Sequence, residues 1–254
     1  MNTYVYGVLQ PADAAGWAGA NGVGGSVRAL VSGDLAALVS NIADDARPGT
    51  REDLEAHRRV LEQAIEIGTV IPMRFGMIMD DDATVCERLL TRHGDELRNL
   101  LRTLAGTVQM AVRAFYAEDA LLGAALADDE EIQRLNALVE GRPEIETRDE
   151  RIALGERIAA GIERRRERDA EALVEQLRPF AVDLQVEPPA GERMALSAQL
   201  LVRRADRAAL DARIGQIGTA LQGYLTLLYL GPLSPYSFTA LELEPETSEP
   251  AVRG

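Results

Sequence analysis

The chain has 254 residues, of which 46% are hydrophobic, enough for one large or two modest domains with a real core. Its 41 acidic and 27 basic residues give a net charge of −14, which repels nucleic-acid phosphates and anionic lipid, so we expect neither nucleic acid nor membrane as a partner. All the basic residues are arginine, which excludes chemistry that requires a lysine.

The chain contains no apolar run near the ~20 residues that a membrane helix needs, and its N-terminus lacks the pattern of a signal peptide. Cys86 is the single cysteine, so no disulfide can form within the chain. We therefore expect a cytoplasmic protein.

The first part of the chain alternates strand and helix patterns. Thr3–Leu9 predicts a strand, and Val27–Ile42 predicts two strands joined by a turn at Ser32-Gly33-Asp34. Thr50 and Asp53 form a capping box that opens a helix through about residue 67.

The next segment, 69–79, switches to a period of two and predicts one strand. Pro72 makes it an edge strand or a bulged one. The acidic run 80–82 then caps a helix that ends near Gly106. One face of the predicted strand carries Ile71, Met73, Phe75, Met77 and Met79.

After Gly106 the predicted order is strand, helices, strand, strand, helix, strand. The segments are 107–116, a charged helical region 119–177 broken at 141–143, a hairpin of 180–189 with 193–204, a helix 206–222 and a strand 224–230 that ends at Gly231-Pro232. This βαββαβ order is typical of a ferredoxin-like, split-βαβ domain.

We therefore predict an α+β protein of two domains, with helices on one face of each sheet. Residues 1–106 form an N-terminal α+β domain, and residues 107–240 form the ferredoxin-like domain with its inserted helical region 119–177. The acidic, proline-containing segment 241–254 is predicted to be a disordered tail.

Catalytic groups are scarce. His57 lies on the apolar stripe of its helix with Leu54 and Leu61, and is either a general base or a buried structural histidine; we favour the second, because no serine or cysteine partner is identifiable nearby. The same holds for His93. We expect no catalytic, metal or cofactor-binding residue: the acids at 80–82 are interpreted as a helix cap, Cys86 as a core residue and the glycines at 22–25 as a connection.

Three features have both a structural and a binding interpretation. Arg74 lies between Met73 and Phe75, as an internal clamp or as an interface residue. Met73 and Met77 are core residues or an adaptable contact surface, and we favour core. The basic run 164–168 is a solvated helix face or a docking site for an acidic partner.

The segment YLTLLYLGPLSPYSF (224–238) holds 4 of the 11 aromatic residues. Pro232 and Pro235 stiffen it, so that Tyr236 and Phe238 are held in place. The two rings either pack between the domains, which we favour, or anchor a partner protein.

Several blocks of the chain resemble the GvpF/GvpL gas vesicle proteins. IPMRFGMIMDDD resembles their P-x-R-F-G strand, RIALGERIAAGIERRR a helical block, and LGPLSPYSF their C-terminal G-P-W-P-P-Y-S-F signature. YVYGVL and the helix AHRRVLE, which includes His57, also fit. The matches are collinear from Tyr4 to Phe238, and the chain departs at Leu233 and Ser234, where the family more often has Trp and Pro.

The resemblance implies an N-terminal α+β domain, a ferredoxin-like C-terminal domain and no enzymatic activity. It implies a minor structural or accessory protein that binds the major gas vesicle shell protein, and other accessory proteins, and assists nucleation or assembly. It places such a protein in the gas vesicle, at the gas-facing side of the shell. The alternative from another class is a small-molecule-binding regulatory protein that uses a ferredoxin-like domain, which fold analogy alone supports.

Overall fold

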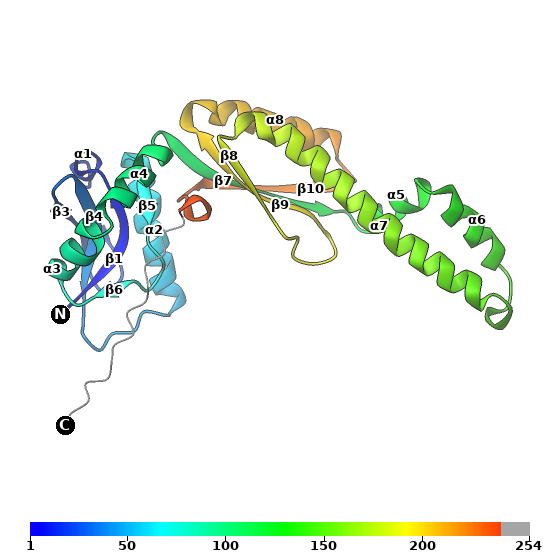
Figure 1. Cartoon of the computed structure of the whole chain (residues 1–254), viewed down its shortest axis with the longest axis horizontal. Coiled ribbons are helices and arrows are strands. Elements are labelled where there is room, and N and C mark those ends of the chain that lie inside the picture. Colours follow the sequence, from blue (N-terminus) through cyan, green and yellow to red (C-terminus); the bar gives the residue numbers. More distant parts are fainter. Residues whose placement is uncertain (240–254) are drawn as a thin grey trace, which may run out of the picture.

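The computed structural model describes residues 1–239, so the predicted tail 241–254 lies outside the described residues. Within 1–239 the chain forms two separate sheets with helices, which confirms the α+β class (Figure 1). The main elements are β1 (Asn2–Leu9), α1 (Pro11–Ala14), β2 (Ala20–Asn21), β3 (Ser26–Ser32), β4 (Leu35–Ile42), α2 (Arg51–Ile67), β5 (Val70–Pro72), β6 (Ile78–Met79), α3 (Asp82–Thr84), α4 (Gly94–Leu104), β7 (Thr107–Tyr116), α5 (Ala120–Ala127), α6 (Glu130–Val139), α7 (Arg148–Leu177), β8 (Asp183–Glu187), β9 (Met194–Arg203), α8 (Arg207–Ala220) and β10 (Leu225–Leu233).

The first sheet is built around β1, which is buried along almost its whole length. Its order is β2-β3-β4-β1-β5, and β6 also pairs with β1. A bulge between Val5 and Gly7 shifts the register of β1 against β4. Gly7 is needed there, because a Cβ atom would lie 2.9 Å from the carbonyl oxygen of Ile71.

Helices cover this first sheet on both faces, and the prediction of one covered face is wrong here. Tyr4 and Tyr6 pack on the side of α2, whereas Val5 and Val8 pack on the side of α4. The cause is in β1 itself. Its side chains on both faces of the sheet are apolar and fully buried, so neither face of the strand is suited to water.

The segment 69–79 is not one strand. β5 ends at Pro72, a turn follows, and pairing with β1 resumes only at Ile78. Pro72 removes a backbone donor, and Gly76 takes a φ of +86°, which a side chain disfavours. The prediction that Met73, Phe75 and Met77 share one face is also wrong. Phe75 packs with the hydrophobic cluster on the α2 side of the first sheet, whereas Met73 and Met77 pack with the cluster on the α4 side.

The helix predicted over 80–106 is interrupted. Asp81 accepts from the backbone N–H of Thr84 at 2.7 Å, which confirms the predicted cap. Residues 85–91 then wind as a π-helix, at whose end Arg92 donates its backbone N–H to the carbonyl of Glu87, five residues earlier, at 3.1 Å, and α4 begins anew at Gly94. His93, with φ −100° and ψ 16°, separates the two.

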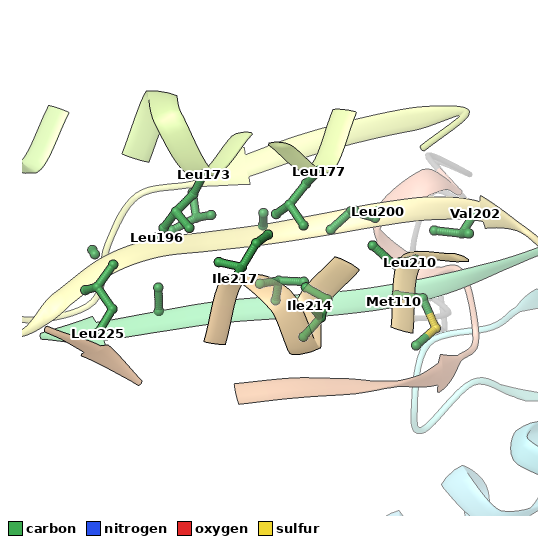
Figure 2. Close-up of a cluster of buried hydrophobic side chains, with 14 of the residues drawn as sticks. Met110, Leu173, Leu177, Leu196, Leu200, Val202, Leu210, Ile214, Ile217 and Leu225 are labelled. Atoms are coloured by element: carbon green, nitrogen blue, oxygen red, sulfur yellow. The ribbon is translucent and has the colours of Figure 1, made fainter. Parts of the chain in front are cut away.

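The second sheet has the order β10-β7-β9-β8, with every pair antiparallel. α7 and α8 cover one face, and Figure 2 shows their side chains meeting those of β7 and β9. The chain order after Gly106 is the predicted one. The labelled core residues are Met110, Leu173, Leu177, Leu196, Leu200, Val202, Leu210, Ile214, Ile217 and Leu225.

β10 continues beyond its predicted end. It crosses Gly231 and Pro232, joined by a cis peptide bond, and pairs again at Leu233 opposite Gln109 after a register shift. Gly231 has a φ of +144°, and a Cβ atom there would overlap Met110. Glycine therefore lets the strand pass over the core and carry the chain toward the first sheet.

An arm formed by α5, α6 and the first half of α7 extends away from both sheets (Figure 1). The basic run 164–168 fastens this arm. Arg165 and Arg168 pair with Asp128 at 2.9 Å, and Arg164 pairs with Asp129 at 3.0 Å. These partners lie at the α5–α6 corner, so the run forms more than the expected contacts within one helix.

Candidate functional site

Two of the family-like sequence blocks meet in space, although Met73 and Tyr236 lie 163 positions apart. The hydroxyl of Tyr236 donates to the carbonyl of Met73 at 3.0 Å and lies 2.9 Å from Nε2 of His57. On the other side of the ring, Nδ1 of His57 lies 2.9 Å from the hydroxyl of Tyr4. Gly76 donates its backbone N–H to that same hydroxyl at 3.0 Å.

One pattern of protons satisfies all of these contacts. Because Tyr236 gives its proton to Met73, its oxygen accepts from Nε2–H of His57. Nδ1 then accepts from Tyr4, whose oxygen accepts from Gly76. His57 is therefore assigned as the neutral tautomer with its proton on Nε2. We call Tyr4, His57 and Tyr236, with the backbone groups of Met73 and Gly76, the tyrosine–histidine chain.

Burial sets the charge states of His57 and of the two tyrosines that bind it. His57 is 2% exposed, and burial lowers the pKa of His57 to about 4, so the ring is neutral at neutral pH. Burial also raises the pKa of Tyr4 to about 12 and the pKa of Tyr236 above its ordinary value. With both ring nitrogens occupied by tyrosines, His57 is bound as a structural residue, the interpretation that we favoured.

Rings surround His57 as well. Tyr6 stacks on it at 5.4 Å between centroids, and Phe75 meets it edge-on at 5.7 Å. The stripe predicted for α2 is correct for Leu61 but wrong for Leu54, which is 51% exposed.

The tyrosine–histidine chain holds a turn, residues 73–77, in one conformation. Met73 donates its N–H to Tyr6 at 2.8 Å, and Met77 donates to the carbonyl of Arg74 at 3.2 Å. Together with the bonds to the Met73 carbonyl and the Gly76 N–H, these contacts tie down both ends of the turn. Its shape is thus set by the protein before any partner arrives.

Arg74 is the residue that this turn presents. Its side chain is exposed, and within residues 1–239 it has neither an ion pair nor a side-chain hydrogen bond. The expected position in the middle of a strand is therefore wrong, because Arg74 lies in the turn between β5 and β6. Of the two interpretations left open, the internal clamp has no partner group within residues 1–239, and the turn carries the guanidinium into water. Met73, by contrast, is 2% exposed and belongs to the core, while Met77 and Phe75 are half-buried.

The C-terminal segment 234–238 touches both sheets. Tyr236 contacts the first sheet as described, and Ser237 contacts the second through two bonds of 3.1 Å with the side chain of Gln109 on β7. Phe238 packs against the α4 cluster, which includes Leu201 of β9. Pro235 is buried and Pro232 half-buried behind them.

Sequence reasoning missed two members of this site. Tyr4 looked like an ordinary alternating strand residue, and no local signal marks its contact with a histidine 53 positions away. Gln109 did carry a signal, because it is polar within the apolar run 107–112. A buried polar side chain requires a partner, and its amide bonds Gln199 as well as Ser237.

Other candidates have structural roles. Asp82 receives bonds from Arg28 and Thr3, and His93 lies 3.6 Å from Glu96. Across residues 1–239 no group of three or more His, Cys, Asp or Glu side chains is placed to hold a metal ion. In the same range, no helix has the length and apolar character required to span a membrane.

The comparisons with known proteins agree on one family. The sequence model described as gas vesicle synthesis protein GvpL/GvpF matches residues 2–240. A gas vesicle protein F from Streptomyces sp. is 39% identical over 246 residues, covering 94% of this chain and 99% of that protein. Gas vesicle protein F of Dolichospermum flosaquae is 25% identical over 218 residues, covering 85% and 88%.

Solved structures show the same fold. The crystal structure of the gas vesicle protein GvpF from Anabaena sp. PCC7120 superposes with a TM-score of 0.82 at 24% identity, covering 93% of this chain and 97% of that one. GvpF from Microcystis aeruginosa gives a TM-score of 0.76 at 23% identity, covering 93% and 98%.

Proposed function

The chain belongs to the GvpL/GvpF family of gas vesicle synthesis proteins, and from this premise we propose that it is a non-enzymatic accessory protein that binds the major shell protein and assists nucleation or assembly of the vesicle. The observation that carries the proposal is the fixed turn at 73–77, which presents Arg74 from one of the family-like blocks. His57, which helps to hold this turn, is neutral and has a hydrogen-bond partner at each ring nitrogen. Such a histidine suits a structural framework better than a catalytic site.

The turn has the properties of a protein-binding element. A loop that is already held in its bound shape loses little conformational entropy on association, so more of the contact energy appears as affinity. Arginine is enriched in interfaces, and Arg74 lacks an internal counter-charge within the described residues. We propose Arg74, with the exposed parts of Phe75 and Met77, as the contact for a carboxylate and neighbouring apolar atoms of the shell protein.

We further propose that the protein acts at the gas vesicle, on the gas-facing side of the shell. The net charge of −14 supports the role of a carrier, because mutual repulsion keeps copies that hold an apolar client from aggregating.

Co-purification tests the proposal. The chain and the major shell protein are produced together and each alone; we expect them to elute together, with the shell protein soluble only when this chain is present. Arg74→Ala should weaken the complex, whereas Arg134→Ala on α6, another exposed arginine at the far end of the molecule, should not. If the chain elutes alone and the shell protein behaves as it does without it, the proposal is wrong.

A further inference from the structure

The two edges of the second sheet are built differently. β8, at one edge, is a strand of five residues, DLQVE, with an acid at each end. β10, at the other edge, is a strand of nine residues, LTLLYLGPL, without a single charge. Short length and charge are the usual means by which a protein blocks pairing at a sheet edge, and β8 has both while β10 has neither.

The outward backbone groups of β10 follow from its register. Ala117 donates its N–H to the carbonyl of Tyr224, so this pair is a hydrogen-bonded one. Antiparallel pairs alternate, so residues 226, 228 and 230 turn their backbone groups toward β7, and 225, 227 and 229 turn theirs away. Leu225 donates its N–H to the carbonyl of Leu221. The amides and carbonyls of Leu227 and Tyr229 are left facing outward, and within residues 1–239 no strand pairs with them.

The side chains at this edge are apolar. Leu228 is 41% exposed and Leu230 is 40% exposed, both on the sheet face that α7 and α8 do not cover. The Gly231-Pro232 bulge closes one end of the edge, so about six residues, roughly 20 Å, remain for pairing.

Charge indicates what kind of strand fits. On the uncovered face the acids Asp183 and Glu187 lie on β8, whereas Arg113 of β7 lies directly opposite Leu228. Arg113 is half-buried and, in the part of the chain that the structure describes, has no ion pair or side-chain hydrogen bond. A carboxylate on an added strand would supply the missing counter-charge.

We propose that β10 is a docking edge for an extended, apolar segment of a partner protein that carries one carboxylate, which adds as a fifth antiparallel strand and reaches Arg113. A second copy of this chain fits less well, because β10 offers no carboxylate and each copy brings a charge of −14. Only the identity of the partner, the shell protein, rests on the proposed function; the edge and its chemistry do not.

The test uses a labelled octapeptide of alternating valine and threonine with one central glutamate, and a second peptide with lysine in its place. Fluorescence anisotropy with the whole chain should show binding of the glutamate peptide and weaker binding of the lysine peptide. The double variant L228D/L230D, which places like charges beside the peptide glutamate, should lower affinity by about tenfold or more. Val186→Asp, on β8 at a side chain that is 54% exposed, is the matched control and should bind as the unaltered chain does.

Amide hydrogen exchange then locates the peptide. On binding, the amides of Leu227 and Tyr229 should gain protection, and those of β8 should not. Thr226→Asp, a second exposed change on β10, should reproduce the loss if the double variant unfolds. The inference is overturned if the glutamate peptide does not bind, if protection appears at β8, or if the chain dimerises and protects β10 without peptide.

A final comparison separates this inference from the proposed function. If the shell protein co-purifies equally with L228D/L230D and with the unaltered chain, the β10 edge is not where it binds, while the proposed function stands. If the shell protein fails to co-purify with the unaltered chain, the proposed function fails, and the peptide measurement still decides whether β10 is a docking edge.

Discussion

The two sheets of this protein bury their residues in different ways. In the first sheet, helices cover both faces and even polar groups such as His57 are sealed inside. In the second, α7 and α8 cover one face, and the other carries the buried Gln109, the half-buried Arg113 and, on β10, the exposed Leu228 and Leu230. The first sheet is therefore a frame for the turn at 73–77, whereas the second has an edge strand, β10, whose Leu228 and Leu230 side chains meet water.

The largest expected difference in the free energy of unfolding comes from a leucine-to-alanine substitution made once in each sheet. Leu38→Ala removes a fully buried side chain of β4 and should lower the free energy of unfolding by about 2–5 kcal/mol, because a cavity is left behind. Leu228→Ala should cost less than about 1 kcal/mol, because that side chain already meets water. Urea unfolding of both variants measures the difference; equal losses would mean that the Leu228 side chain is covered after all.

Acid should weaken the first sheet through His57. The ordinary pKa of histidine is 6.5, and burial lowers the pKa of His57 to about 4 in the folded chain, so the unfolded state binds the proton more readily. Stability is thus full above pH 6.5 and falls as the pH drops toward 4, by on the order of 3 kcal/mol. Unfolding measured from pH 7.5 to 4.5 should show this slope.

His57→Gln provides the control for that slope. The variant should be less stable at neutral pH, because a tyrosine loses its partner, but its stability should change less between pH 6.5 and 4.5. A slope as steep as that of the unaltered chain would show that another group causes the acid sensitivity.

Phe238→Ala tests the junction of the two sheets. The ring is half-buried against a cluster that contains residues of both, so its loss should cost about 1–2 kcal/mol and lower the thermal midpoint by several degrees. An unchanged midpoint, measured by calorimetry, would mean that the C-terminal segment lies on the protein without stabilising the contact between the sheets.

Local patterns in the sequence predicted the elements better than their arrangement. The capping box of Thr50 and Asp53 and the turn at Gly33 depend on residues a few positions apart, and both are present as predicted. The boundaries of α2 agree for the same reason. The division into domains at Gly106 stays a prediction, since hydrophobic contacts such as those of Leu201 cross between the two sheets.

The arrangement escaped prediction where it depends on distant residues. The bulge at Val5–Gly7 and the apolar residues of both parities in β1 put helices on two faces, which a count of elements does not reveal. The bond between His57 and Tyr236 joins residues 179 positions apart. The resemblance to the family identified the sequence blocks that contain His57 and Tyr236, but only the three-dimensional structure shows that they contact each other.

The smallest expected effect isolates one hydroxyl of the tyrosine–histidine chain. Tyr236→Phe removes both the donor to the Met73 carbonyl and the acceptor for Nε2–H of His57 but keeps the ring, and should cost about 1 kcal/mol, because the half-exposed Tyr236 site lets water replace the lost hydroxyl. Its specific consequence is local: the turn at 73–77 loses one of its ties, so the Gly76 amide should exchange faster.

Tyr229→Phe is the matched control for this change, since its hydroxyl bonds Asp211 within the second part of the chain. It should leave exchange at Gly76 unaltered. If both variants speed exchange of the Gly76 amide equally, the turn responds to the overall stability of the protein. If only Tyr236→Phe speeds it, the C-terminal segment sets the shape in which Arg74 is presented. Binding of the shell protein should then weaken in the same variant, because a mobile turn must be ordered again on association.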